Sequence, residues 1–218
     1  MASRTVSKDI ITLRGSAAIV SEFFGFKYFI LINTNTTEAS SNEQIKHSTD
    51  KRQVMQQTGE NNTLHIPISD YSEEWLEAGN LQRVVLVIMS KATSEVLERW
   101  NFNIETDAEV VEKRIIKEKC DKEIMREIQA IMRQIASCIT YLPCLDEACV
   151  FDVLAYTDKD TTVPIAWLES DAKLINNPQM VKLHSFDTKI HKVDPFVSYK
   201  NDEREDEEEE EEQVFYKT

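Results

Sequence analysis

Side chains that could do chemistry are present in this sequence, but their spacing matches no metal-binding pattern. The cysteines fall close together and form no CxxC pair: Cys120, Cys138, Cys144 and Cys149. The histidines are scattered, without a cysteine or carboxylate set that resembles a metal shell: His47, His65, His184 and His191. His184 and His191 lie in one predicted strand at a spacing that should point their side chains to opposite faces. The sequence therefore predicts no metal site.

Phosphate binding and nucleophilic catalysis also lack a motif. No glycine belongs to a GxxxxGK or GxGxxG run, so no phosphate-cradling loop can be assembled. Neither Cys144 nor Cys149 is flanked by the glycine-rich turn that usually exposes a nucleophile. Only a Cys–His pair assembled in space stays open, and the paired acids Glu73 and Glu74 are more simply a solvated face. We predict that the protein is not an enzyme and has no cofactor.

The acidic charge is concentrated at one end of the chain. The formal net charge is −14, and residues 202–212 contribute ten acids and one arginine, or −9. The remaining −5 offers no basic surplus to neutralise phosphates, which argues against nucleic acid as a partner. No segment approaches the ~18 consecutive apolar residues that span a bilayer. We expect a soluble intracellular protein with a disordered acidic tail, which could still dock basic partners.

The first half of the chain predicts two helices around a polar gap. Ile10, Leu13, Ala17, Val20 and Phe24 recur at helical spacing, which predicts a helix over residues 9–26. The stretch from Asn33 to Thr63 is rich in Asn, Thr, Ser and Gln, so we expect a long mobile loop there. A short helix should follow, within residues 72–76.

The second half predicts strands around one long helix. The apolar run Leu81–Met89 is typical of a central strand, and the alternation in Val96–Glu105 of a half-buried one. A helix is predicted over residues 107–140. Further strands are predicted at Cys149–Tyr156, Val181–Val193 and Phe196–Tyr199. This order favours an α+β fold, with helices packed on one face of a mostly antiparallel sheet.

Several strings, in this order, resemble the HORMA-domain proteins of the spindle assembly checkpoint, the mitotic arrest deficient two family. They include ITLRGS at 11–16, EFF at 22–24, VLERW at 96–100, MRQI at 132–135, YTDKD at 156–160 and IHKV at 190–193. The resemblance covers residues 10–25 and roughly 72–200. It implies a HORMA domain over residues 1–200 and an extra disordered acidic tail over 201–218.

Residues 26–70 depart from the family pattern, although the distance between the flanking matches is family-like. The segment therefore looks substituted and partly disordered, either as a divergent isoform or through a gene-model error. In the family, the C-terminal segment, here 160–200, is a mobile safety belt with two arrangements. The open form covers a sheet edge, whereas the closed form crosses to the other side and pins a partner peptide. An added peptide strand would satisfy the unpaired backbone groups of that edge.

The resemblance also implies site residues. Strand 149–156 would offer the peptide edge, and the expected peptide-binding residues are Trp75, Trp100, Phe151, Val153, Ala155 and Tyr156. Core packing is the alternative role of both tryptophans. Arg133, Gln134 and Tyr141 would form a dimer and adaptor interface, unless the first two are a solvated polar pair. Ser170, in the belt, could carry a regulatory phosphate.

The implied function is checkpoint signalling by open-to-closed conversion. The chain would trap peptides of the anaphase-promoting complex activator and of a kinetochore receptor, and so delay anaphase. Other implied partners are a second copy of the chain and an AAA+ remodelling ATPase with its adaptor; the location would be nucleus, kinetochore and cytoplasm. Alternatives are a HORMA adaptor in DNA repair or the meiotic chromosome axis, an acidic chaperone-like binder, and a misfolded isoform.

Overall fold

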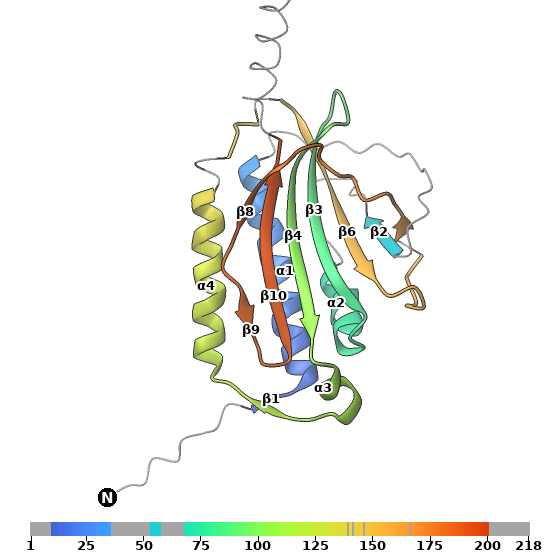
Figure 1. Ribbon diagram of the computed structural model, residues 1–218, viewed down its shortest axis with the longest axis vertical. Coiled ribbons are helices and arrows are strands. Elements are labelled where there is room, and N and C mark those ends of the chain that lie inside the picture. The colour runs from blue at the N-terminus through green and yellow to red at the C-terminus, as the bar shows by residue number, and fades with distance from the viewer. Residues whose placement is uncertain are drawn as a thin grey trace, which may run out of the picture.

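The computed structural model describes residues 10–35, 53–57, 68–138, 140, 142–145, 147–165 and 167–200. In these ranges the main sheet has the strand order β7-β2-β6-β3-β4-β10-β8, and β9 also pairs with β10 (Figure 1). Every neighbouring pair is antiparallel. The strands are β2 (Gln53–Gln57), β3 (Leu81–Ser90), β4 (Val96–Thr106), β6 (Cys149–Thr157), β7 (Leu168–Glu169), β8 (Gln179–Lys182), β9 (Phe186–Asp187) and β10 (His191–Tyr199).

Three helices supply the layer that covers one face of this sheet. They are α1 (Leu13–Asn35), α2 (Ile68–Glu77) and α4 (Asp121–Cys138). Figure 1 shows α1 behind the centre of the sheet and α4 beside β8 and β9. Buried side chains of the helices and of the inward strand face form one cluster, which includes Val20, Phe24, Leu76, Ile131, Leu86, Trp100, Phe102 and Val153. The predicted α+β architecture is therefore confirmed. None of the described helices has the length and hydropathy to span a membrane.

The central strands are buried on both faces. In β3, Val84, Leu86 and Ile88 join the helix-side cluster, while Val85 and Val87 join a second cluster on the opposite face. This confirms the predicted central strand. The half-buried pattern predicted for β4 is wrong only in its central part, because Arg99 and Asn101 are buried, whereas Asn103 is half-buried and Glu105 is exposed. Arg99 and Asn101 belong to a strand that lies between β3 and β10, and both make hydrogen bonds. Asn101 Nδ2 donates to the Arg99 carbonyl at 3.0 Å, and Arg99 Nη2 donates to the Tyr156 hydroxyl at 3.4 Å.

The N-terminal helix begins and ends later than the predicted range 9–26, and Thr12 caps it. The Thr12 hydroxyl accepts from the Gly15 N–H at 3.0 Å, so the helix begins at Leu13, and it continues to Asn35. The predicted loop from Asn33 to Thr63 is wrong at Asn33–Asn35, which are helical, and at β2. The rest of that loop, together with Tyr141 and the tail 201–218, lies outside the described residues.

The helix predicted over residues 107–140 is two helices joined by a short strand. Asp107 caps α3 (Ala108–Lys113), and Arg114 ends it with a left-handed backbone, φ 53°. The chain then extends as β5 (Lys117–Glu118), which pairs with β1 (Ile10–Ile11). Sequence periodicity missed the break because Arg114 is an unusual residue for that conformation.

The C-terminal strands also differ from the prediction. The expected strand Val181–Val193 is divided into β8, β9 and the start of β10. β8 ends at Lys182 and β9 begins at Phe186, and the chain reverses at Lys189, with φ 74°, between β9 and β10. Residues Phe196–Tyr199 belong to β10. His184 lies between β8 and β9, while His191 is fully buried at the start of β10. The expectation that these two histidines share one strand is therefore wrong.

Candidate functional site at the outer edge of the sheet

The candidate functional site is the outer edge of β6, where two further strands are added to the sheet. The inner side of β6 pairs with β3 along its length, from Cys149 to Thr157. Its outer side pairs with β2 from Val153 to Thr157. The next strand outward is β7, which pairs with β2 at Met55 and Gln56. The edge of β6 therefore holds an added strand, and a piece of the C-terminal segment lies against that strand.

The C-terminal segment crosses from this edge to the other side of the sheet. After β7 the chain passes over one end of the sheet and enters β8 (Figure 1). β10 then pairs with β4 along its length, from His191↔Thr106 to Tyr199↔Glu98. Of the two arrangements that the family resemblance implies, the structure therefore has the closed one, in which the final strands lie away from β6.

A pair of tryptophans anchors the crossing segment to the helical layer. Trp75 in α2 and Trp167, just before β7, are each 4% exposed. Their ring centroids are 5.5 Å apart at an interplanar angle of 67°, an edge-to-face contact. Trp75 Nε1 also donates to the Thr162 carbonyl at 3.3 Å. Trp75 thus contacts the belt itself at two points, whereas Trp100 is fully buried and its Nε1 donates to Glu98.

An ion pair fixes the belt farther along its path. Lys173 Nζ contacts Asp152 Oδ2, and the side chain of Asp152 is only 5% exposed. Asp152 belongs to β6, so this pair links the belt to the strand whose edge is in question. A buried carboxylate without its partner is destabilising, because no nearby opposite charge then offsets its desolvation.

His191 fastens the start of β10 to the helices. Its Nδ1 lies 2.6 Å from the Ser16 hydroxyl, and its Nε2 lies 3.1 Å from the Leu76 carbonyl. A carbonyl can only accept, so Nε2 carries the proton and Nδ1 accepts from Ser16. Burial lowers the pKa of His191, because the charged ring would lose its hydration. The hydroxyl of Thr188 completes the cluster, 2.5 Å from that of Ser16.

The long helix α4 holds the segment between β8 and β10. Gln134 Oε1 accepts from the His184 backbone N–H at 2.7 Å, and Glu127 Oε2 accepts from that of Asp187 at 3.0 Å. Gln134 is half-buried, while its neighbour Arg133 is exposed and donates to the carbonyl one turn earlier. The two predicted interface residues therefore have different surroundings.

The residues predicted to bind peptide do not all face one surface. The side chains of Val153 and Ala155 are buried on the helix side, and that of Tyr156 is buried on the opposite face. All three lie in the register with β2, so they contact an added strand through their backbone. Phe151 is half-buried, opposite Ile88 of β3, and lies outside that register. Ser170 is half-buried directly after β7.

Four further residues shape the site and were not predicted: Trp167, Lys173, His191 and Ser16. Ser16 and His191 lie within strings that resemble the family, at 11–16 and 190–193. Their partners lie far away along the chain, so no local spacing could identify these contacts.

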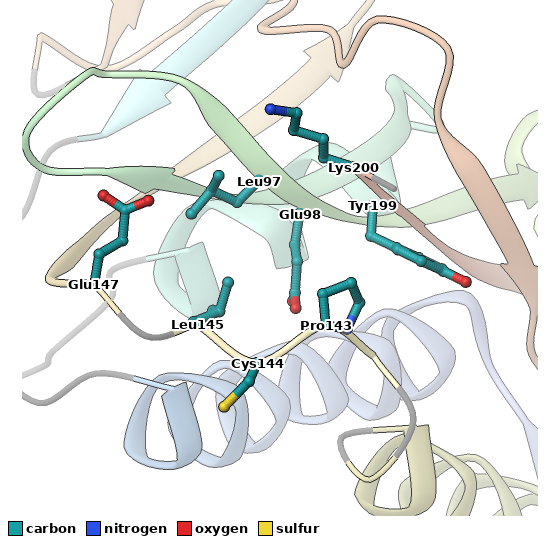
Figure 2. A pocket seen from close by; sticks show the side chains of 8 residues that line it. All are labelled: Leu97, Glu98, Pro143, Cys144, Leu145, Glu147, Tyr199 and Lys200. Carbon is teal, nitrogen blue, oxygen red and sulfur yellow. The ribbon is translucent and has the colours of Figure 1, made fainter. Parts of the chain in front are cut away.

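A small hollow lies beside the start of β4 and the end of β10, against the loop that precedes β6. Figure 2 shows its lining: Leu97, Glu98, Pro143, Cys144, Leu145, Glu147, Tyr199 and Lys200. Burial raises the pKa of Glu98, although its hydrogen bond from Trp100 partly offsets that effect. None of the predicted peptide-binding residues lines this hollow. Among the described residues, no group of three or more His, Cys, Asp and Glu could hold a metal ion.

Comparisons with known proteins match most of the chain. The HORMA domain family model matches residues 21–191. The mitotic spindle checkpoint protein MAD2 of Zea mays is 71% identical over 204 residues, covering 93% of this chain and 98% of that protein. The MAD2A protein of Homo sapiens is 38% identical over 208 residues, covering 92% and 98%. A chain in the crystal structure of the mitotic checkpoint complex aligns with a TM-score of 0.65 and 31% identity, covering 86% of this chain and all of that one.

Proposed function

The chain belongs to the HORMA-domain family and, within it, to the mitotic spindle checkpoint proteins, and from this we propose that it traps a short partner peptide at the outer edge of β6. The single observation that supports this site most is the strand order: β7 of the C-terminal segment lies outside a strand that is added to β6. A partner peptide in that position would be held on both sides by backbone hydrogen bonds.

The proposed trap is the safety belt, residues 160–200 of a HORMA domain that extends over 1–200. It is anchored at Trp75 in α2, at Asp152 in β6 and, at the start of β10, at His191. A peptide beneath it can leave only after these anchors separate. Slow release is therefore a consequence of the packing, and the strength of peptide contacts is a smaller factor.

Trapping requires that the belt adopt two arrangements. Moving from the open to the closed arrangement exchanges one set of strand pairings for another, so the two can differ by a few kcal/mol. β10 and β8 make the closed set, against β4 and each other. Capture of a peptide would favour this closed set of pairings, because the peptide would provide hydrogen-bond partners for the β6 edge, with which β8–β10 do not pair.

We propose peptides of the anaphase-promoting complex activator and of a kinetochore receptor as partners, and delay of anaphase as the outcome. The exposed Arg133 would belong to an interface with a second copy of the chain, together with Gln134 and Tyr141. An AAA+ remodelling ATPase with its adaptor would reopen the closed form. The proposed locations are nucleus, kinetochore and cytoplasm. This role needs no catalytic site, and we expect no enzymatic activity.

The test is retention of a labelled synthetic peptide from a checkpoint activator after extensive dilution. We expect the intact protein to keep the peptide for hours. Cutting the chain at a protease site introduced at 158–160, where the belt begins, should release it rapidly. The matched control carries the same site in the β3–β4 turn, at 91–93, and should keep its peptide after cutting. Equal release from both cut proteins would contradict a belt mechanism.

A further inference from the structure

The strand that occupies the β6 edge in this structure belongs to the chain itself. β2, Gln53–Gln57, pairs along its whole length with β6, from Gln53↔Thr157 to Gln57↔Val153. We propose that Gln53–Gln57 is an internal occupant of the peptide site: it fills the edge in the absence of a partner, and a partner peptide must displace it. This inference rests on the proposed function of the β6 edge.

The placement of β2 carries the inference. It lies between β6 and β7, so the belt strand pairs with it through Met55↔Glu169 and Gln56↔Leu168. A strand that only extended the sheet would have no reason to lie inside the closed C-terminal segment. β2 thus stands where the proposed trap places a peptide: against the edge and under the belt.

The residue types of β2 suit an occupant that can be exchanged. QVMQQ carries no charge and no proline, so all five N–H groups are available for backbone hydrogen bonds, alternately toward one neighbouring strand and the other. Four of its five residues are not β-branched, and such residues favour strands only weakly. Its binding then depends on backbone pairing more than on intrinsic strand preference, and a peptide with better side chains can replace it.

Self-occupancy has two consequences for function. First, β2 provides hydrogen-bond partners for the backbone groups of the β6 edge, so the closed arrangement can be stable before any partner binds. Second, β2 competes with partners at the effective concentration of a segment of the same chain, which can reach about millimolar. For a peptide of micromolar intrinsic affinity and an equally strong internal strand, the apparent affinity falls by about a thousandfold.

The test uses the full chain with Val54→Pro and Met55→Pro together. Adjacent residues of a strand direct their N–H groups to opposite sides, so the pair removes one donor toward β6 and one toward β7. The matched control, Val54→Ala with Met55→Ala, keeps both donors. A second variant replaces residues 53–57 by a Gly-Ser sequence of equal length.

The deciding readout is residue-resolved hydrogen exchange in β6, over Val153–Thr157. Alternate amides of this stretch face β2, and the others face β3. In the wild type both sets should be protected. In the proline and Gly-Ser variants the β2-facing set should lose about a hundredfold or more of its protection, while the β3-facing set keeps it and shows that the fold is intact. Fast exchange of the β2-facing set in the wild type, or protection that neither variant reduces, would overturn the inference.

A second readout separates this inference from the proposed function. A labelled synthetic peptide with the sequence of residues 50–60 is added at micromolar concentration to each protein. We expect binding to the proline variant and none to the wild type or the alanine control. If the edge amides are exposed in the proline variant and no peptide binds, self-occupancy stands and peptide trapping at this edge is contradicted.

Discussion

Replacing Trp167 by alanine is the sharpest perturbation of the proposed belt. The indole is 4% exposed and packs edge-to-face on Trp75, with ring centroids 5.5 Å apart. Both rings are large, and only one of them belongs to the segment that must move. The substitution therefore weakens the docking of the belt while the sheet and the helices keep their own contacts.

The size of the effect follows from the buried ring. Burying an aromatic side chain removes about 150–250 Å² from water, and at ~25 cal/mol per Å² that contributes about 4–6 kcal/mol. Measured Trp→Ala replacements in cores cost about 3–5 kcal/mol. Taking the lower end, the open fraction of the belt should rise by about a hundredfold, since each 1.4 kcal/mol is a factor of ten.

The assay compares hydrogen exchange in the belt with that in the core. Amides of Leu168 and Glu169 report belt opening, and amides in the centre of β3 report global unfolding. Trp167→Ala should accelerate the first set by about a hundredfold and change the second set much less. Trp167→Phe, which keeps an edge-to-face ring, should fall between the wild type and the alanine variant.

Two outcomes would refute this reasoning. Unchanged exchange at Leu168 and Glu169 would mean that the tryptophan pair does not hold the belt. An equal acceleration in β3 would mean that belt and core open together, so that the belt is not a separate unit.

Three further predictions concern buried charges and a buried histidine. Burial raises the pKa of Glu98, so wild-type stability should decline as pH rises above 4.5 through the folded pKa. Glu98→Gln can still accept the hydrogen bond from Trp100 and should remove this decline. In urea titrations at pH 7, its free energy of unfolding should exceed that of the wild type by on the order of 1 kcal/mol. Burial lowers the pKa of His191, so stability should fall as pH drops below 6.5 through the folded pKa, and chemical denaturation of His191→Gln should show a weaker acid dependence. Lys173→Met should cost about 3–5 kcal/mol by leaving Asp152 unpaired, and Asp152→Asn in the same chain should recover much of that loss in thermal melts.

Local patterns predicted the elements whose residues decide their own burial. The apolar run at Leu81–Met89 needs a position between two strands, and it has one between β4 and β6. The apolar stripe of the N-terminal helix likewise predicted its buried face from Leu13 to Phe24, although Ile10 lies in β1 and is exposed. For such elements the spacing of apolar residues along the sequence is sufficient to predict both the type of element and its buried face.

Elements that depend on distant partners escaped prediction. β2 is polar and reads as a loop, because its strand conformation comes from pairing with β6, about a hundred residues later. The break at Arg114 and the turn at Lys189 depend on backbone conformations that residue type does not favour.

The candidate site was predictable only in part. The resemblance to the family placed the peptide edge on strand 149–156 and the belt over 160–200. It could not give the contacts that fasten the belt. Trp75 contacts Trp167 and Thr162, which lie about ninety residues away, and the buried acceptor for His191 is a carbonyl in α2.

The central claim, that the final strands lock an added strand onto β6, can be tested with a reversible disulfide. Glu105 in β4 and Lys192 in β10 are directly opposed and both partly exposed. Opposed strand residues have Cα atoms about 4.5–5.5 Å apart, within the range that a disulfide bridges. The pair Glu105→Cys and Lys192→Cys therefore ties the closed arrangement together. With a labelled peptide already bound, oxidation should slow its dissociation by at least about tenfold, and reduction should restore the original rate. Dissociation that is equally fast in the oxidised and reduced proteins would show that the peptide leaves without movement of the belt, and would contradict the account.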